Sequence, residues 1–510
     1  MEEKDQTEAR NGKVCVRFPP SPTGLMHLGT ARLALFNYIF SKQHNGRLVF
    51  RLDDTDKERS KPEYIQDIID GLGWLGITYD DGPYYQSQRG PVYAGFLKKL
   101  LKDGNAYYCF CSREDLEAQR QYQMSRSEPP VYSGKCSGIS LEEAEARLSK
   151  GERAVIRFRT KIKKIEFNDI VRGELSFDSA LLGDFVIAKD LDNALYNFVS
   201  TIDDSVMGIT HVIRGEDVLP NTPKQILIQE ALGFPIPVYA HLPLILGPDR
   251  SKLSKRHGAT SVTEYKKMGY LPEAMINFMA FLGWNPGTEE EVYSIQGLIR
   301  DFSLEKIQKG GAVFNAKRLD YLNGFYIRRH SAKALAELCV PYLAESGLIA
   351  LDEDDKNAYE IVATGERIGF DYLEKIAGYL QPRLKKLAEI SELADYFFAR
   401  DLETGIDMLK WKDATAENTK LALDELINLV SKIGEGEWTK EKIEQAILPA
   451  SESFSKKINK TEWDRGYLLW PMRAALSAKK MSLGPFEIAD VLGKQKTLLR
   501  FRAAIDSLSL

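Results

Sequence analysis

Near its beginning the chain shows an order of apolar and polar positions that predicts a strand, a stiff loop and a helix. Residues 14–18 form a short, largely apolar run of the kind found in buried strands. Residues 19–24 contain three prolines and a glycine, which force a tight, irregular turn. Apolar side chains then recur at helical spacing over residues 33–40, so we expect a helix that begins near Leu28. This pattern predicts that His27 lies where the loop meets the helix.

A second largely apolar run, residues 47–52, follows this helix. A strand, a helix and a strand at this spacing form a crossover unit, whose strands are parallel. Asp53, Asp54 and Asp56 come directly after the second strand, at the edge where open α/β sheets bind ligands. These acids fit two hypotheses, a metal ion or a single carboxylate that faces the ammonium group of an amino acid.

The α/β pattern is interrupted from about residue 82 to 193. It then resumes, and the apolar run at residues 211–214 is part of it. Beyond residue 330 strand signals vanish. Residues 332–347 and 366–399 show amphipathic helical periodicity, and so does most of the remainder. We therefore predict an α/β core with an inserted α+β domain, followed by an all-α half.

Composition narrows the class of protein. The chain has 510 residues, which suggests roughly three domains or more. Its net charge of −4 excludes a global basic field, so a nucleic-acid partner would have to be held by local patches. Five irregularly spaced cysteines do not form a disulfide framework. Without an apolar leader or a membrane-length apolar stretch, we expect a soluble, cytoplasmic protein with no membrane partner.

The loop before the first predicted helix suits a phosphate. Backbone N–H groups and the positive end of the helix dipole gather at such a helix start and favour an anion. Gly29 leaves room for a nucleotide against the backbone, and His27 can donate a hydrogen bond to a phosphate oxygen. The alternative is a histidine at a helix start that binds no ligand.

A second candidate lies far downstream. Residues 251–258 follow the apolar run 241–246 and a turn, and they contain Lys252, Lys255 and Arg256. Three cations within five residues suit a polyphosphate, although a solvated basic loop has the same composition. The two stretches together favour a nucleotide site.

These stretches carry a resemblance to a known family. Residues 27–30 (His-Leu-Gly-Thr) resemble the HIGH motif of class I aminoacyl-tRNA synthetases, and residues 252–256 resemble their KMSKS motif. The sequence Arg-Phe-Pro-Pro-Ser-Pro-Thr-Gly at residues 17–24 narrows the resemblance to glutamyl-tRNA synthetases of the bacterial type. Residues 310–324 and 471–476 extend it over nearly the whole chain.

The resemblance implies a Rossmann-like catalytic core in two halves, an inserted connective domain that binds the tRNA acceptor end, a stem-contact region and two helical anticodon-binding domains. The catalytic halves are residues 1–81 (HIGH motif 20–30) and 194–249, the insert is 82–193, the stem-contact region is 250–330, and the helical domains are 331–390 and 391–510.

The resemblance also implies a reaction, the ATP-dependent ligation of L-glutamate to the 3′ end of tRNA(Glu) through a glutamyl-adenylate, with Mg²⁺ accompanying ATP. The implied catalytic residues are His27, Lys252 and Lys255, and the implied ATP-binding residues are His27, Gly29, Thr30 and Lys255. The implied glutamate-binding residues are Arg17, Ser21, Asp53, Tyr196 and Arg214. A dicarboxylate suits two cationic clamps, because arginine offers a bidentate fork to each carboxylate. The family usually has glutamate where this chain has Asp53, one bond (about 1.5 Å) shorter.

The insert holds a candidate metal site. On a strand, Cys109 and Cys111 would point to the same face, as two ligands of one metal would. The resemblance implies zinc, with Cys136 and Tyr132 as further ligands, because Gly138 stands where a histidine can occur. The alternative is a set of reduced, partly buried cysteines without metal.

Basic side chains recur in the helical half and are candidates for phosphate and anticodon contacts, although each also fits a solvated helix face. Arg383 is the residue that we expect to read an anticodon base. The others are Lys385, Lys386, Lys456, Lys457, Lys460, Lys494, Lys496, Arg500 and Arg502.

Two questions about function stay open at this point. The enzyme either discriminates against tRNA(Gln) or charges it as well, and a non-catalytic tRNA-binding paralogue is a further alternative. A small-molecule nucleotidyltransferase fits less well, since such enzymes are shorter and lack a helical half. We expect a monomer.

Overall fold

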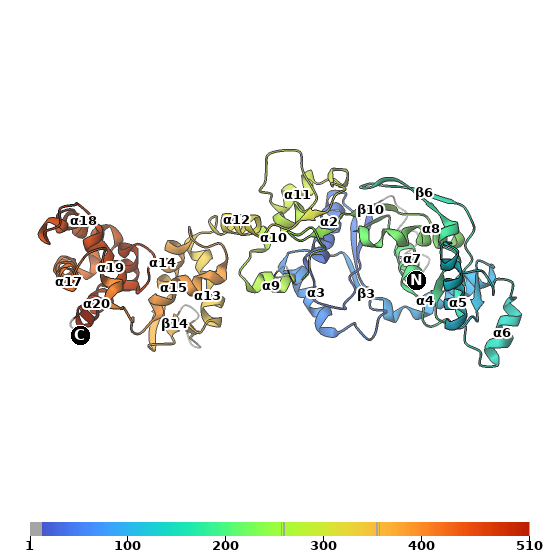
Figure 1. Cartoon of the computed structure of the whole chain (residues 1–510), viewed down its shortest axis with the longest axis horizontal. Helices are drawn as coiled ribbons and strands as arrows, with labels where there is room; N and C mark the ends of the chain where they lie inside the picture. Colours follow the sequence, from blue (N-terminus) through green and yellow to red (C-terminus); the bar gives the residue numbers. More distant parts are fainter. Residues whose placement is uncertain are drawn as a thin grey trace. The chain divides into compact units, whose positions relative to one another are not determined.

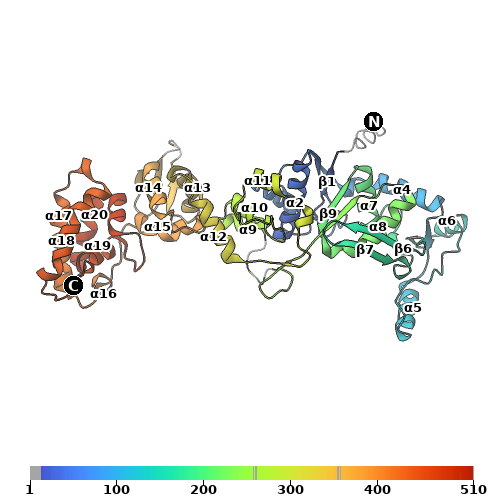
Figure 2. The ribbon, with the colours of Figure 1, turned by 90° about the horizontal axis from the view of Figure 1, so that it is seen from above.

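The computed structural model describes residues 13–254, 256, 258, 261–352, 355 and 358–508. The chain divides into two compact units (Figures 1 and 2). The first unit runs to Lys266 and includes Pro272–Leu319, and the second combines Lys267–Leu271 with the chain from Asp320 onward.

A parallel sheet forms the centre of the first unit. β2 pairs with β1 on one side and with β3 on the other, both in parallel. β9 lies beside β1, because the Thr210 N–H donates to the Cys15 carbonyl at 2.9 Å, and β10 pairs with β9 in parallel. The predicted crossover unit is confirmed. The strands are β1 (Cys15–Phe18), β2 (Arg47–Leu52), β3 (Asp81–Tyr85), β9 (His211–Gly215) and β10 (Val238–Leu242).

Helices cover this sheet. α2 (Leu28–Gln43) begins at the predicted residue and packs against β1, β2 and β9, with Leu35 and Phe36 fully buried. The short strands β11 (Ile245–Leu246) and β12 (Ala312–Val313) pair in parallel. The other helices of this unit are α3 (Pro62–Trp74), α7 (Tyr196–Val206), α8 (Thr222–Leu232), α9 (Val262–Lys267), α10 (Pro272–Ala280) and α11 (Ile295–Asp301). The helix α12 (Ala316–Ile327) begins in the first unit, and from Asp320 onward it belongs to the second.

The predicted insert contains an antiparallel sheet of order β4-β5-β8. Its hairpin β6–β7 joins the parallel strands, since Asp169 of β6 pairs with Tyr239 of β10. Leu97 of α4 lies in one buried cluster with Val49 and Phe198, so the insert shares a hydrophobic core with the central sheet. The elements are α4 (Gly90–Lys102), β4 (Ala106–Cys109), α5 (Arg113–Ser125), α6 (Leu141–Ser149), β5 (Val155–Phe158), β6 (Lys164–Asp169), β7 (Gly173–Asp178) and β8 (Val186–Ala188).

The second unit is mainly helical, as predicted, but it also contains an antiparallel sheet of order β13-β14-β15. Residues 366–369 are therefore a strand, although we predict a helix there from their periodicity. No helix among the described residues is long and apolar enough to cross a membrane. The elements are α13 (Ala332–Glu345), β13 (Ile349–Leu351), β14 (Ala358–Ile361), β15 (Glu366–Gly369), α14 (Phe370–Leu380), α15 (Ile390–Phe398), α16 (Ile406–Leu409), α17 (Ala416–Ser431), α18 (Lys440–Lys457), α19 (Gly466–Ser477) and α20 (Pro485–Leu508).

Candidate active site

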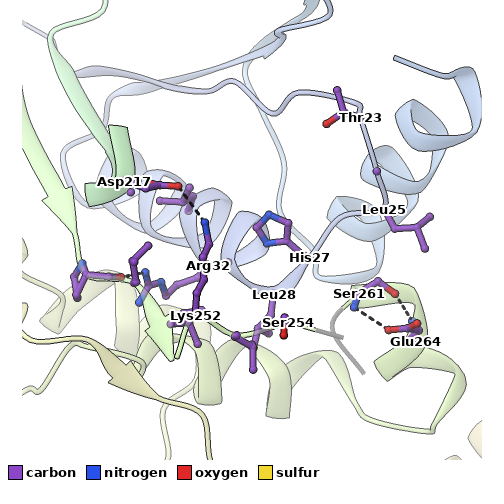
Figure 3. Close-up of a pocket in the computed structure, with 18 of the residues that line it drawn as sticks. Thr23, Leu25, His27, Leu28, Arg32, Asp217, Lys252, Ser254, Ser261 and Glu264 are labelled. Atoms are coloured by element: carbon purple, nitrogen blue, oxygen red, sulfur yellow. Dashed lines mark hydrogen bonds and ion pairs between the residues drawn. The ribbon is translucent and has the colours of Figure 1, made fainter. Parts of the chain in front are cut away.

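A cavity of about 720 Å³ lies in the first unit, between the start of α2 and the loop after β11 (Figure 3). Both predicted motifs line it, the first through His27 and Gly29 and the second through residues 252–254. The Met26 carbonyl accepts the Val262 N–H at 2.9 Å, which ties the first motif to the segment after the second. The fold thus brings the two stretches together.

His27 is the N-cap residue of α2. The Thr30 backbone N–H donates to His27 Nδ1 at 3.1 Å, so in the neutral imidazole the proton is on Nε2. Partial loss of solvent around the ring, followed by the charge of Lys252, lowers the pKa of His27 and favours this neutral form, although the residue stays exposed to the cavity. The Thr30 hydroxyl lies 3.0 Å from Nε2, where a phosphate oxygen could take its place as the acceptor.

Gly29 leaves room for the imidazole of His27 in its present position. A Cβ atom at Gly29 would lie 3.1 Å from two atoms of the His27 ring, closer than an ordinary van der Waals contact. We predict from the sequence that Gly29 makes room for a nucleotide, and the structure adds that it makes room for the imidazole.

The second motif reaches the cavity through Lys252. Its Nζ lies 3.4 Å from Asp217 Oδ2, and both side chains are exposed. Arg256 pairs with Asp249 at 3.0 Å, outside the lining of the cavity. The predicted catalytic residue Lys255 lies outside the described residues.

A buried ionic network joins two of the predicted glutamate-binding residues, Arg17 and Asp53. Arg51 donates from Nε to Asp53 Oδ1 at 2.8 Å and from Nη1 to Asp204 Oδ1 at 2.8 Å. Arg17 Nε donates to Asp204 Oδ2 at 3.2 Å, and all four side chains are buried. Burial raises the pKa of Asp53 to about 6, although the charge of Arg51 opposes this shift.

The acids after β2 do not converge on one point. Asp54 accepts from the Ser87 backbone N–H at 2.8 Å, and Asp56 accepts from Arg59 Nε at 2.7 Å, whereas Asp53 faces the buried network. Among the described residues, the group that could hold a metal ion is made of cysteines elsewhere. These contacts favour the hypothesis of a single carboxylate for an ammonium group.

Arg214 and the remaining predicted glutamate-binding residues lie near this network. The Arg17 Nη1 donates to the Ile213 carbonyl at 3.2 Å, next to the buried Arg214. Burial lowers the pKa of Arg214, and Tyr196, which is 40% exposed, opposes that shift. The exposed Ser21 adjoins Pro20, whose carbonyl accepts the Asp53 N–H at 3.0 Å.

Sequence reasoning missed Arg51, Asp204 and Asp217, which hold Asp53, Arg17 and Lys252. Arg51 had a readable signal, because a charged residue inside an otherwise apolar strand has to find a buried partner. Asp204 and Asp217 had none, since their partners are distant in sequence.

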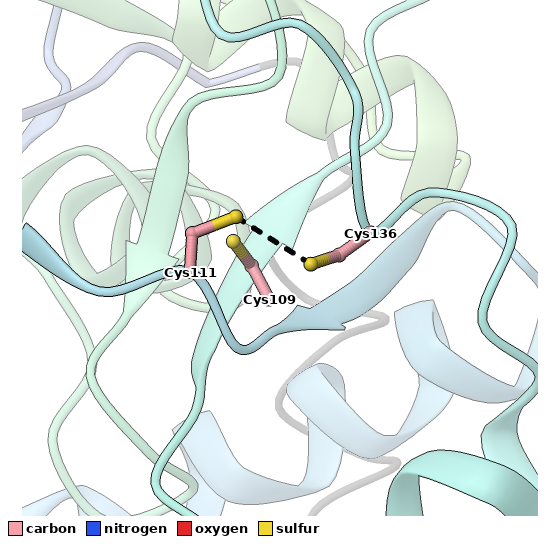
Figure 4. Close-up of side chains that lie close together, drawn as sticks. All are labelled: Cys109, Cys111 and Cys136. Carbon is pink, nitrogen blue, oxygen red and sulfur yellow. Dashed lines mark hydrogen bonds between the residues drawn. The ribbon is translucent and has the colours of Figure 1, made fainter. Parts of the chain in front are cut away.

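The predicted metal ligands converge (Figure 4). The sulfur atoms of Cys109, Cys111 and Cys136 all lie within 4.8 Å of one another. The Tyr132 hydroxyl lies 3.3 Å from Cys109 Sγ and 3.4 Å from Cys111 Sγ. β4 ends at Cys109, so the chain after the strand, and not strand alternation, brings Cys111 to this point. Three sulfurs and one oxygen match the four ligands of tetrahedral zinc.

The basic side chains of the helical unit differ in how far they are exposed to solvent. Arg383 is exposed and donates to the Ser482 carbonyl. Arg500 is buried and donates to the carbonyls of Leu476 and Tyr396, so the expectation that it contacts tRNA is wrong. Lys494 likewise donates to two backbone carbonyls.

The fold and the two motifs define a class I aminoacyl-tRNA synthetase. Residues 13–321 match the family described as "tRNA synthetases class I (E and Q), catalytic domain", and residues 334–505 match the family described as "Anticodon binding domain".

Relatives of known name narrow the class. The chain is 41% identical over 498 residues to "Glutamate--tRNA ligase 1" of Caldanaerobacter subterraneus subsp. tengcongensis. The aligned region covers 97% of this chain and 98% of that relative. The chain is 40% identical, with the same coverage, to "Glutamate--tRNA ligase 2" of Thermoanaerobacter pseudethanolicus. A crystal structure of a glutamate tRNA ligase from Elizabethkingia meningosepticum in complex with its amino acid superposes with a TM-score of 0.82 at 30% identity, over 97% of this chain and 100% of that chain. The chain belongs to the glutamate–tRNA ligase family.

Proposed function

We propose that this protein ligates L-glutamate to the 3′ end of tRNA(Glu) in two ATP-dependent steps. The observation that carries the proposal is the cavity lined by both motifs in a unit that also buries Arg17, Arg214 and Asp53. The lining of the cavity provides donors for a triphosphate. The three buried residues provide two cations and one anion for an amino-acid dicarboxylate.

In the first step, an oxygen of the glutamate α-carboxylate attacks the α-phosphorus of ATP, and pyrophosphate leaves. His27 donates its Nε2–H to an α-phosphate oxygen as charge develops there, and Lys252 holds the departing phosphates. Asp53 holds the substrate ammonium, while Arg17 and Arg214 hold its carboxylates. Positioning and charge stabilisation thus account for the rate.

In the second step, the terminal adenosine hydroxyl of tRNA attacks the activated carbonyl carbon, and AMP leaves. Mg²⁺ accompanies ATP and offsets phosphate charge. We assign anticodon recognition to the helical unit, with Arg383 as the base-reading candidate, and we propose a cytoplasmic location, where translation takes place.

We further propose that Cys109, Cys111, Cys136 and Tyr132 hold one zinc ion. All four ligand positions would then be filled by protein, which is the mark of a structural site rather than a catalytic one. The bound ion would fix the segment after β4 to the loop that carries Cys136.

The test is the charging of purified tRNA(Glu) and tRNA(Gln) with labelled glutamate, together with ATP–pyrophosphate exchange with and without tRNA. We expect charging of tRNA(Glu) and exchange that depends on tRNA. Charging of both tRNAs would define a non-discriminating enzyme. Charging of neither, with the fold intact, would refute the proposal.

A further inference from the structure

Arg214 is a buried cation whose hydrogen bonds use three of the five N–H groups of its guanidinium. Its Nε donates to His241 Nε2 at 3.0 Å, its Nη1 to Gln225 Oε1 at 2.8 Å, and its Nη2 to Thr222 Oγ1 at 2.7 Å. An arginine has five N–H groups, so one N–H remains on each terminal nitrogen. Among the described residues, no carboxylate lies within ion-pair distance of Arg214; the charge of Asp204, which pairs with Arg17, acts on Arg214 only from farther away. A buried charge of this kind calls for an anionic ligand.

His241 supplies the acceptor for the Arg214 Nε–H. The two residues are paired in register on neighbouring strands, β10 and β9, and His241 is fully buried. His241 Nδ1 lies 2.6 Å from Asp169 Oδ2, and Asp169 also accepts the His241 backbone N–H. The proton is therefore on Nδ1, and Nε2 presents its lone pair to Arg214.

We propose that Asp169 and His241 form a positioning relay that aims the two remaining N–H groups of Arg214 at the side-chain carboxylate of glutamate. This inference rests on the proposed function. The side-chain end is assigned to Arg214 because Asp53, the candidate for the ammonium group, belongs to the network of Arg51, Asp204 and Arg17.

The relay also explains selection against glutamine. The acceptors beside the guanidinium, on His241, Gln225 and Thr222, each receive an N–H of Arg214, and the Thr222 hydroxyl lies 3.1 Å from the same His241 Nε2. The Gln225 Nε2 is buried and has no hydrogen-bond partner among the described residues, so it adds another donor. A surface of donors accepts a carboxylate, but it sets N–H against N–H when a carboxamide enters. Burial lowers the pKa of His241, which keeps its Nε2 an acceptor.

The experiment compares tRNA charging by the full-length wild type and by variants of the relay. His241→Phe removes the acceptor, and His241→Gln restores an acceptor oxygen. In Asp169→Asn the amide oxygen stays with the backbone N–H groups of Val171 and Arg172, which donate to Asp169 Oδ1, so an NH2 group faces His241 Nδ1 and favours the other tautomer. His211→Phe is the control, because His211 lies at the other end of β9, in register with Val238. KM for glutamate, KM for ATP, kcat and kcat/KM for glutamine are measured, with a melting curve for each variant.

We expect His241→Phe and Asp169→Asn to raise KM for glutamate about 10–100-fold and to lower the preference for glutamate over glutamine about 10-fold, with KM for ATP unchanged. His241→Gln is expected to recover most of this loss, and His211→Phe to match the wild type. The relay would be overturned if kcat fell while KM for glutamate and KM for ATP rose equally, and if the variant His241→Gln recovered none of the loss. If His241→Phe does not fold, Asp169→Asn decides, and an unchanged KM for glutamate in that variant overturns the inference. A wild type that charges no tRNA would instead refute the proposed function.

Discussion

At the scale of single residues, the candidate site depends on side chains that hold other side chains in place. His27 receives a hydrogen bond from the Thr30 backbone, Lys252 faces Asp217, and Asp53 is held by Arg51. Each of these three proposed contacts with substrate therefore has a protein partner that fixes its direction, and preorganisation of this kind is what makes a donor effective in a transition state.

Replacement of Gly29 by alanine tests the position of His27. The added Cβ would lie 3.1 Å from the imidazole, so we expect the ring to shift and kcat for charging to fall about 10–100-fold with the melting temperature nearly unchanged. Steady-state charging assays measure this. Gly73→Ala is the matched control, because its Cβ would meet no atom within 4 Å, and full activity of Gly29→Ala would contradict the role of Gly29.

Asp53 predicts a pH dependence of glutamate binding. Its pKa is raised to about 6, so the carboxylate is ionised above that pH and gains a proton below it. We expect kcat/KM for glutamate to fall about tenfold for each pH unit below 6, because neutral Asp53 no longer attracts the substrate ammonium. Assays from pH 5 to 8 measure this. The variant Asp53→Asn should have a low kcat/KM for glutamate that does not fall further below pH 6. A fall of equal size in that variant would assign it to another group.

At the scale of elements, the cysteine cluster and the helix α20 show that residue type alone does not reveal a role. Cys109 ends a strand and Cys111 follows it, yet both reach Cys136. Arg500 and Arg502 are two residues apart on α20, but the first is buried and the second is exposed.

Zinc content tests the cysteine cluster. We expect about one zinc ion per purified chain, and we expect Cys136→Ser to lose it and to melt several degrees lower. Elemental analysis by mass spectrometry and a thermal melt measure these two quantities. Cys339→Ser is the control, because Cys339 is buried in α13 of the second unit and should leave the zinc content unchanged. Metal-free wild type with normal stability would contradict the zinc assignment.

Arg500 is expected to stabilise the second unit. Its removal leaves the carbonyls of Leu476 and Tyr396 buried without their donors, so Arg500→Ala should lower the free energy of unfolding by about 2–4 kcal/mol. Urea denaturation measures the loss. Arg502→Ala, on the exposed side, should stay within about 0.5 kcal/mol of the wild type. Equal stabilities of the two variants would argue against the structural role of Arg500.

At the scale of the whole molecule, the division into two compact units predicts two cooperative transitions on heating. Differential scanning calorimetry should show that Cys136→Ser lowers one transition and that Arg500→Ala lowers the other, since the two residues belong to different units. A single transition that both variants shift equally would mean that the units unfold together. A monomeric state stays a prediction.

The chain's own order of residues determined the strand, loop and helix around His27, the crossover to β2, the helical character of the second half and the chemistry of the two motifs. These features depend on periodicity and on the local limits that proline and glycine impose, which act over a few residues. The small sheet β13–β15 was not predicted from the sequence, because its strands are short and lie between amphipathic helices.

Only the tertiary structure decided which charges are buried, which of them are paired and which donors stay unused. Asp204 between two arginines, His241 behind Arg214 and Arg500 in the core of its unit all depend on contacts between residues far apart in the chain. Such contacts follow from strand register and helix packing, and a shift of one residue in register would turn a buried side chain to the opposite face. Residue types along the chain therefore define the candidate chemistry, and packing defines which side chains can perform it.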